Sequence, residues 1–548
     1  MVVLAACDSG ASRASTTEMA GTTEHSHVTS VPTATVAPSV ELPVTKTFSG
    51  EVSLPEGFTV PAEERWVFDP DANTKVTVSG NVIVEGVLEM RPRSGEVEHA
   101  LIFEGVDESG FVGGGLDPVE SDVGLWVMGN GQLLIEGEEK TAWSYEFDPA
   151  WEGDEVVATP YLPGEYTTFE PVSEAPPPNE LGYRAELLNL SRNVRIEGTP
   201  DGFTHVFIRS TRPQTIRYAA LRYVAPAFSE ETDRTGRYGI HFHMAGDGSR
   251  GSIVEGVVVR DAGNHAFVPH GSHGITFRST IAYHVMNEAY WWDPNDDDEE
   301  IAHDSHDILW ERAVAAGIDL GPGGSRYRLA AFFLGDGANL VVRDSVAVGV
   351  QGESGSDRAG FIWPEAAGAP WTFEGNLAHN NDANGIFVWQ NISNRHDTTT
   401  FTAYYNAQAG IEHGAYSNAY QYRDLTLLGN GVAIHSHALG EPTEGADTQT
   451  WADITSEGGG LFIDKHARPG EAPVRFLRCD LGKVMVADGG GDEPGAYDFV
   501  DCGLEPEDFD LTQAHPGTVI RVQRGDGSAY RLGVGGSVEE ITPFYTEG

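Results

Sequence analysis

The stretch "NHAFVPHGSHGITFRSTIAYHVMNEAYWWD", residues 264–293, contains two copies of one short unit. "NHAFVPH" begins at Asn264 and "NEAYWWD" begins at Asn287, so the copies are 23 residues apart. Each copy reads as a polar turn, a small residue and an apolar strand, without a helical pattern. A strand repeat of this period predicts a parallel β-helix, in which each coil buries its inner face only by stacking on its neighbours.

Similar units begin at Asn384 ("NGIFVWQ") and Asn430 ("NGVAIHS"), and we expect all four asparagines to lie at equivalent turns. Leucine-rich repeats have a similar period, but the leucine scaffold that they need is missing from this chain. The predicted fold class is therefore all-β, with a right-handed parallel β-helix.

The rest of the chain divides by composition. The stretch "KVTVSGNVIVEGVLEM", residues 75–90, alternates apolar and polar residues around turn residues, which indicates short strands. We expect a smaller β-rich module before the β-helix. The predicted divisions are a leader and tether at 1–45, the β module at 46–145, a Pro-rich linker at 146–180, the β-helix at 181–511 and a C-terminal β tail at 512–548.

The charge of the chain excludes two classes of partner. It has 83 acidic residues against 34 Lys and Arg, a formal net charge of −49. Such a surface repels nucleic acids and anionic membranes. No stretch of about 18 apolar residues is present, so we expect no segment that spans a membrane.

The N-terminal sequence "VLAACDSG" matches the cleavage box of a bacterial lipoprotein, with Cys7 as the lipidated residue. The apolar stretch before it is too short for the core of a signal peptide, so we expect a longer precursor. Residues 8–39 are rich in Ser and Thr and fit a flexible tether. The sequence predicts an exported protein that contacts the membrane only through a lipid anchor.

The stretch "RYGIHFHMAGDG", residues 237–248, carries two histidines in what reads as a strand. Because alternate side chains of a strand point the same way, Ile240 and Phe242 should fill the interior while His241 and His243 face outward.

Stacking then converts the period into columns of side chains. When Gly239, Ala266 and Ala289 are aligned, His243, His270 and Asp293 form one column. A second column contains Tyr238, His265 and Glu288, and His241 and His273 lie nearby.

This group of side chains suits two kinds of chemistry. Neighbouring imidazoles and carboxylates can act as general acid and base, and imidazoles also bind transition metals. The alternative is a polar ladder on one face of the β-helix, satisfied by its own hydrogen bonds. The candidate catalytic residues are His241, His243, His270, Asp293 and Glu288.

The acidic run "DPNDDDEE", residues 293–300, offers a further possibility. Dense oxygen ligands suit Ca²⁺, here from Asp293, Asp296, Asp297 and Asp298, although a solvated loop has the same composition. The aromatic residues beside this run, Trp291 and Trp292, either stack on sugar rings or belong to the core.

Cys479 and Cys502 are also 23 residues apart, one period of the repeat. Equivalent positions on adjacent coils lie within the distance that a disulfide spans. The pair is therefore either a disulfide, favoured by export, or two stacked buried thiols.

The segments "GRYGIHFHMAGD" and "NHAFVPHGSHGITFRSTIAYHVMNEAYWWD" resemble the family of the cell-migration-inducing and hyaluronan-binding protein and its cell-surface hyaluronidase relative. "ELLNLSRNVRIEG", residues 186–198, resembles the family's entry into the β-helix, and the N-terminal module resembles its G-eight domain. The chain departs from the family pattern at Gly239, Glu288 and Trp292.

This resemblance implies an enzyme that depolymerises hyaluronan or a related uronate-containing glycan, with Ca²⁺ as a cofactor in some members. The residues it carries over are Arg237, Tyr238, His241, His243, Asp247, His270, His273 and Asp293. The predicted contacts with the substrate are Arg237, Tyr238, His265, His273, Trp291 and Trp292. A polyanionic glycan would need a local basic track on this acidic chain, formed by Arg237, Arg250, Arg260 and Arg278.

The cleavage chemistry stays open between hydrolysis and β-elimination. In hydrolysis, Asp293 or Glu288 would protonate the leaving oxygen. In elimination, His243 or His270 would remove the proton beside a uronate carboxylate that Arg237 neutralises. The alternative function is a noncatalytic glycan-binding or adhesive surface protein.

Overall fold

The computed structural model describes residues 42–227, 236–292, 304–321, 328–351, 357–363, 371–388, 397–414, 420–437, 449–464, 473–490 and 494–546. All the described residues belong to one compact unit, Val36–Gly548, which is called the second unit below. Cys7 lies outside the described residues.

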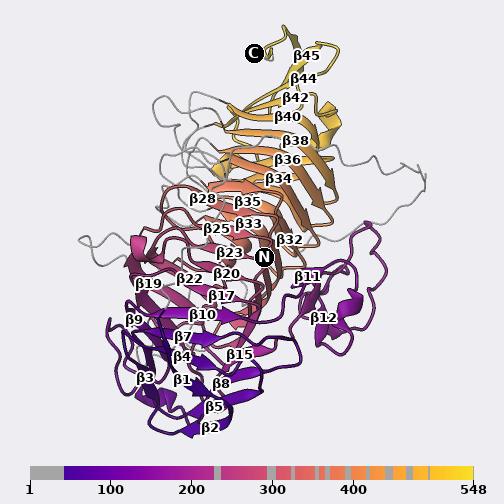
Figure 1. The fold of residues 1–548 in the computed structure, drawn as a ribbon. Helices are drawn as coiled ribbons and strands as arrows, with labels where there is room; N and C mark the ends of the chain where they lie inside the picture. The colour runs from indigo at the N-terminus through magenta and orange to yellow at the C-terminus, as the bar shows by residue number, and fades with distance from the viewer. Residues whose placement is uncertain are drawn as a thin grey trace. The chain divides into compact units, whose positions relative to one another are not determined.

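Three long rows of parallel strands run through the second unit (Figure 1). Before the first two rows merge, nearly every coil contributes one strand to each row, and the coils stack in chain order. The first row begins with β1 (Val44–Phe48), β4 (Arg65–Phe68), β7 (Val87–Met90), β10 (Gln132–Glu136), β17 (Thr215–Arg217), β20 (Ile253–Glu255), β23 (Thr276–Arg278), β25 (Leu309–Glu311), β28 (Leu340–Arg343) and β31 (Trp371–Glu374).

The second row lies beside the first and merges with it at β34 (Asp397–Tyr404). Before the merger it contains β2 (Gly50–Leu54), β5 (Thr74–Val78), β8 (His99–Phe103), β15 (Val194–Glu197), β18 (Ala219–Arg222), β21 (Val258–Ala262), β24 (Ile281–Met286), β26 (Val314–Asp319), β29 (Val346–Val350) and β32 (Leu377–His379). After it come β36 (Gln421–Leu428), β38 (Thr450–Glu457), β40 (Val474–Asp480), β42 (Ala496–Val500) and β44 (Val519–Gln523).

The third row carries the candidate site. Its first part contains β3 (Phe58–Val60), β6 (Val82–Val84), β9 (Leu125–Gly129), β16 (Val206–Ser210), β19 (Ile240–Gly246) and β22 (Phe267–Ser272). Bridges through Tyr290 link β22 to the second part. That part contains β27 (Arg328–Phe333), β30 (Asp357–Trp363), β33 (Asn384–Val388), β35 (Ala409–His413), β37 (Val432–Ser436), β39 (Leu461–Asp464), β41 (Val484–Ala487) and β43 (Phe509–Asp510).

The predicted parallel β-helix is confirmed, but it starts earlier than the sequence indicated. Parallel pairing joins β8 to β15 and β10 to β17, so the coils from Val44 onward are continuous with the later ones. The expected boundary at residue 181 is therefore wrong. Apolar side chains from both regions, among them Val76, Leu101 and Ile196, belong to one buried core.

The region predicted as a Pro-rich linker contains strands of a small antiparallel sheet inserted between β10 and β15. Its strands are β11 (Trp143–Ser144), β12 (Val156–Ala158), β13 (Glu170–Pro171) and β14 (Leu187–Asn189). Trp151, Val156 and Leu187 form a core of its own, while Trp143 and Leu188 pack with Val258 and Ile281 of the second row. The insertion is thus docked on the outside of the β-helix.

The C-terminal tail ends the stack with antiparallel strands. β45 (Ala529–Leu532) pairs with β44, and β46 (Val538–Ile541) pairs with β45. Within the described part of the chain, no helix has the length and apolar character needed to cross a membrane.

Asparagine ladders mark the turns, partly as predicted. The side-chain amide of Asn287 donates to Asn264 at 3.1 Å, so these two occupy equivalent turns. Farther along, Asn381 donates to Asn406 and Asn406 donates to Asn430, each at 2.8 Å. Asn384 lies in β33, outside this ladder, so its predicted equivalence with Asn430 is wrong.

Candidate functional site

Alternation and parallel register bring three histidines together. In β19, Ile240 and Phe242 are fully buried in the core, so His241 and His243 lie on the opposite face of the strand. His243 is the register partner of His270 in β22, as the 27-residue alignment of the two motifs predicts. The histidine face is covered, however: the exposed fractions are 0% for His241, 8% for His243 and 4% for His270.

The ring nitrogens of these three side chains converge, and we call them the histidine triad. His241 Nδ1 donates to the carbonyl of Gly236 at 2.9 Å, which leaves its Nε2 as an acceptor. That Nε2 lies 3.2 Å from His243 Nδ1, which in turn lies 3.1 Å from His270 Nδ1. One nitrogen from each ring falls within 4.8 Å of the others.

The surroundings of His241 hold its imidazole in the neutral form. Burial lowers the pKa of His241 well below its ordinary value, and His243, His270 and Arg237 lower it further. The hydrogen bond to Gly236 raises this pKa but does not offset those effects. A neutral imidazole keeps a lone pair for a proton or for a metal ion.

The triad fits a transition metal better than it fits Ca²⁺. Imidazole nitrogen is a preferred ligand for Zn²⁺ and its neighbours in the first transition row, and three histidines are a known ligand set for catalytic zinc. Ca²⁺ prefers six to eight oxygen ligands, which this cluster does not supply. The residues predicted to bind Ca²⁺, Asp293, Asp296, Asp297 and Asp298, lie outside the described residues.

A second cluster adjoins the triad. Tyr238 lies with its ring centroid 4.8 Å from His241 and 5.0 Å from His265. His265 Nδ1 donates to the backbone carbonyl of Glu288 at 2.8 Å and lies 3.4 Å from the Glu288 carboxylate. Trp291 stacks on His265 with centroids 3.8 Å apart. The predicted column of Tyr238, His265 and Glu288 is therefore adjacent in space.

Arg237 has a different role from the predicted one. Its side chain is only 1% exposed, and its Nε donates to Asp122 Oδ2 at 2.7 Å. The guanidinium also lies 4.6 Å from the ring centroid of Trp126. The prediction that Arg237 binds a substrate carboxylate is therefore wrong in this structure, because the guanidinium is committed to a buried ion pair.

The expected basic track is also neutralised. Each of its other arginines forms an ion pair: Arg250 with Asp247 and Asp307, Arg260 with Glu155, and Arg278 with Glu311. These carboxylates cancel much of the positive field that a polyanion would need.

Two further predicted contacts lie away from the triad. Trp292 is 2% exposed and packs edge-on against Trp310 and Trp371 in the core, so its predicted contact with a sugar ring is wrong. His273 accepts a hydrogen bond from the backbone N–H of His306 at 3.1 Å, and their rings lie 4.6 Å apart. It belongs to a partly exposed turn after β22.

Asp122 is the site neighbour that sequence reasoning missed. It precedes β9 and lies 115 residues before Arg237 in the chain. Burial raises the pKa of the Asp122 carboxyl, but hydrogen bonds from Val112 and Ser121 and the charge of Arg237 outweigh it and keep that pKa low. No local pattern marks this residue, because the pairing of β9 with β16 and of β16 with β19 brings it close.

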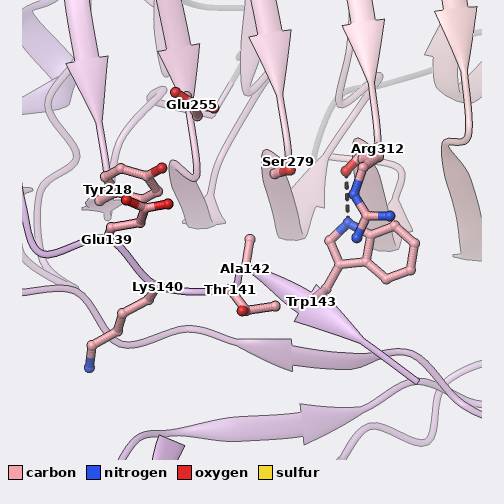
Figure 2. A pocket seen from close by; sticks show the side chains of 9 residues that line it. All are labelled: Glu139, Lys140, Thr141, Ala142, Trp143, Tyr218, Glu255, Ser279 and Arg312. Atoms are coloured by element: carbon pink, nitrogen blue, oxygen red, sulfur yellow. Dashed lines mark hydrogen bonds between the residues drawn. The ribbon is translucent and has the colours of Figure 1, made fainter. Parts of the chain in front are cut away.

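A separate pocket of about 250 Å³ lies between the insertion and the β-helix (Figure 2). Tyr218, Glu255, Ser279 and Arg312 line it from successive coils, and residues 139–143 line it from the insertion. Trp143 Nε1 donates to the carbonyl of Arg312 at 2.7 Å. None of the residues predicted for the site lines this pocket, and Glu139 and Glu255 make part of its wall acidic.

Cys479 and Cys502 form a disulfide, with Cα atoms 4.3 Å apart, between adjacent coils far from the triad.

Comparison with known proteins places the histidine triad inside a recognised segment. No curated protein matches the chain. Residues 230–299, which contain the triad and the Tyr238–His265–Glu288 cluster, match the family model described as the CEMIP beta-helix, and the predicted resemblance is confirmed for this segment.

Proposed function

We propose that this protein is an exported enzyme that cleaves glycosidic bonds of hyaluronan or a related uronate-containing glycan at the histidine triad. One observation carries the proposal: three buried imidazoles converge within 4.8 Å inside the segment that matches the CEMIP beta-helix. Burying three such groups together costs free energy that apolar side chains would not cost, which favours a functional reason for the cluster.

The triad supports proton transfer in the following way. His241 is neutral, and its Nε2 faces His243, so a proton taken up at His243 or His270 can be shared along the row of nitrogens. A divalent transition metal held by the same nitrogens would supply a Lewis acid for an oxygen of the substrate.

The two cleavage routes make different demands on the described residues. Hydrolysis needs a carboxylic acid, for which Glu288 beside His265 is a candidate. Elimination needs a base, for which His243 is a candidate, and also a positive group near the uronate carboxylate. Since Arg237 is paired with Asp122, that positive group would have to be another one.

The test is an assay of the purified chain with hyaluronan, chondroitin and a neutral glucan. Both new reducing ends and the ultraviolet absorbance of unsaturated products are followed, which separates hydrolysis from elimination. A chelator is added in parallel, and Zn²⁺ and Ca²⁺ are then restored separately. We expect cleavage of a uronate-containing polymer and not of the glucan.

Binding of the polymer without new ends or unsaturated products would contradict the proposal and support the noncatalytic glycan-binding alternative. Loss of activity with chelator and rescue by Zn²⁺ alone would show that cleavage depends on a transition metal, and a loss of that rescue in His243→Ala but not in His437→Ala would assign the metal to the triad. Rescue by Ca²⁺ alone would instead assign a Ca²⁺ site outside the triad.

We also propose that the protein is held at the cell surface through a lipid on Cys7. The support is the Leu4-Ala5-Ala6-Cys7 box followed by a Ser/Thr-rich stretch. Expression of the full precursor with labelled fatty acid should label the wild type and not a Cys7→Ala variant. Equal labelling of both would reject the anchor.

A further inference from the structure

A second group of histidines and carboxylates lies in the third row of strands, far along the chain from the triad. Glu412 lies in β35, His435 in β37, His437 directly after β37, and Asp464 at the end of β39. Parallel register pairs Glu412 with His435. The register of β37 with β39 pairs Ser436 with Ile463, so His437 and Asp464 are next to each other.

Alternation places all four side chains on the same face of the row. Ile411 and Ile434, which precede Glu412 and His435, are buried in the core. The four polar side chains therefore point away from the core and form an array across three successive coils, with one on the first, two on the second and one on the third. Their exposed fractions lie between 16% and 23%, so the array is partly open to solvent.

The distances within this array are short. His437 Nε2 lies 3.0 Å from Glu412 Oε1, and His437 Nδ1 lies 2.5 Å from Asp464 Oδ1. His435 Nδ1 lies 3.7 Å from Glu412 Oε1, and His435 Nε2 lies 3.4 Å from Asp464 Oδ2. Glu412, His435 and His437 each bring one ligand atom within 4.8 Å of the others.

These separations suit a shared cation. A tetrahedral metal with bonds of about 2.0–2.2 Å holds its ligand atoms roughly 3.3–3.6 Å apart. The contacts of His435 with Glu412 and Asp464, at 3.7 and 3.4 Å, are close to that spacing, whereas the two contacts of His437 are shorter and would lengthen around an ion. Within the described part of the chain, His435 Nε2 is buried and makes no hydrogen bond, although Asp464 lies beside it.

A hydrogen bond from a residue outside the array orients the carboxylate of Glu412. Asn384 Nδ2 donates to Glu412 Oε2 at 2.7 Å, which leaves Glu412 Oε1 facing the two histidines. Such a partner fixes a ligating carboxylate in place. On the other side, the ring of Phe462 stacks on His435 at 4.9 Å and limits its rotation.

We propose that Glu412, His435, His437 and Asp464 bind a divalent transition-metal ion that clamps three successive coils of the β-helix. Two imidazoles and two carboxylates are a ligand set that Zn²⁺ accepts. The inference is independent of the proposed function, because it concerns neither the triad nor cleavage of a glycan.

The experiment measures metal stoichiometry with Zn²⁺ as the probe. A chain carrying His243→Ala and His270→Ala, which removes two nitrogens of the triad, is stripped with chelator and titrated with Zn²⁺ by calorimetry. We expect one bound ion per chain and a higher melting temperature with Zn²⁺. Adding His437→Ala, or the near-isosteric Glu412→Gln, should weaken Zn²⁺ binding at least tenfold and abolish the rise in melting temperature.

His284→Ala is the matched control, since His284 is an exposed histidine 3.8 Å from a carboxylate, Asp261, outside the array. This substitution should leave the stoichiometry unchanged. Absence of Zn²⁺ binding in the triad-deficient chain would overturn the inference. The inference would also be overturned if the His437→Ala and Glu412→Gln chains were both folded and both still bound one Zn²⁺ ion.

Discussion

At the scale of single residues, the triad shows how a backbone carbonyl can set the chemistry of a buried side chain. Gly236 accepts the Nδ1 proton of His241 and thereby turns the Nε2 lone pair toward His243. The same bond holds the ring in place, as the outer partner of a metal-ligating histidine does. His243 is the most exposed member of the triad, although all three are buried.

If the triad is catalytic, His243→Ala and His270→Ala should each lower kcat by about 100-fold or more, the usual effect of losing a general acid or base. The measurement is steady-state turnover on the polymer identified by the assay above, with melting curves to verify folding. His284→Ala should keep wild-type turnover. An unchanged kcat in a folded His243→Ala protein would leave the triad with a structural role.

The ion pair of Arg237 with Asp122 predicts a large loss of stability. The two side chains are 1% and 0% exposed, so Asp122→Ala would leave a buried guanidinium without its carboxylate. Removing one partner of such a pair costs about 3–5 kcal/mol. Asp247→Ala, which breaks the exposed pair with Arg250, should cost at most about 1 kcal/mol. Denaturant unfolding of both variants measures the difference, and equal losses would refute this assignment.

At the scale of elements, one arrangement of strands produced both metal-competent clusters. A His-x-His pair that begins in a strand of the third row presents two imidazoles on one face, and parallel register adds a ligand from the adjacent coil. This holds for His241 and His243 with His270, and for His435 and His437 with Glu412. Alternation alone would have predicted that each pair of histidines shares a face, but identifying the partner on the adjacent coil required the register.

The inserted sheet is attached to the β-helix by a buried polar contact that predicts pH-dependent stability. Glu186, just before β14, lies 3.0 Å from His379 Nε2 and accepts from the Thr159 hydroxyl at 2.6 Å. Burial raises the pKa of Glu186, but His379 and Thr159 outweigh it, and the net pKa is below the ordinary value of 4.5. The folded state therefore binds fewer protons than the unfolded state as the pH falls through this region.

This contribution of Glu186 to stability should be complete above about pH 4.5 and decline as the pH drops toward its folded pKa. Melting temperatures of the wild type and Glu186→Gln, measured between pH 7 and pH 3, test this. The variant should be less stable at pH 7 and lose less on acidification. Parallel pH profiles for the two proteins would show that Glu186 does not titrate in this way.

The disulfide predicts a second contribution, in the C-terminal coils. Cys479 and Cys502 are 23 residues apart, and closing a loop of that length is worth about 3 kcal/mol by chain entropy. Reduction of the disulfide, or replacement of both cysteines by serine, should lower the melting temperature of these coils. Limited proteolysis measures this loss as weaker protection of the C-terminal coils. Identical protection in the oxidised and reduced protein would contradict this expectation.

At the scale of the whole molecule, the periodic part of the fold was predictable and the aperiodic contacts were not. The 23-residue period placed Asn264 beside Asn287, and the alignment of the motifs placed His243 beside His270. The coils before residue 136 lack that repeat. They join the later coils through the pairing of β8 with β15 and of β10 with β17, and the alternation of apolar and polar residues does not specify which strands pair. The prediction for Asn384 was wrong because the Asn-Gly pairs at Asn384 and Asn430 looked equivalent. Ile386 pairs with Ile411 and Ile411 pairs with Ile434, and this register offsets the two Asn-Gly pairs by two residues.

The roles of Arg237 and Trp292 were unpredictable for the same reason. Asp122 is 115 residues from Arg237, and Trp371 is far along the chain from Trp292, so only the stacked coils bring these partners together. Sequence identified the residue types of the site but could not tell which of them face a substrate and which are buried.

The net charge of −49 should make the rate of association with a polyanionic glycan depend on salt. With Arg237, Arg250, Arg260 and Arg278 all paired to carboxylates, the field around the molecule repels a polyanion such as hyaluronan at low ionic strength. Salt shortens the range of this repulsion, from about 30 Å at 0.01 M to about 3 Å at 1 M. For a hyaluronan-cleaving enzyme, kcat/KM should therefore rise by tenfold or more across that range, mainly through KM. A neutral glucan oligomer, if bound, should show little change in affinity. A fall of kcat/KM with salt would mean instead that a local basic surface, outside the arginine pairs described here, attracts the polymer.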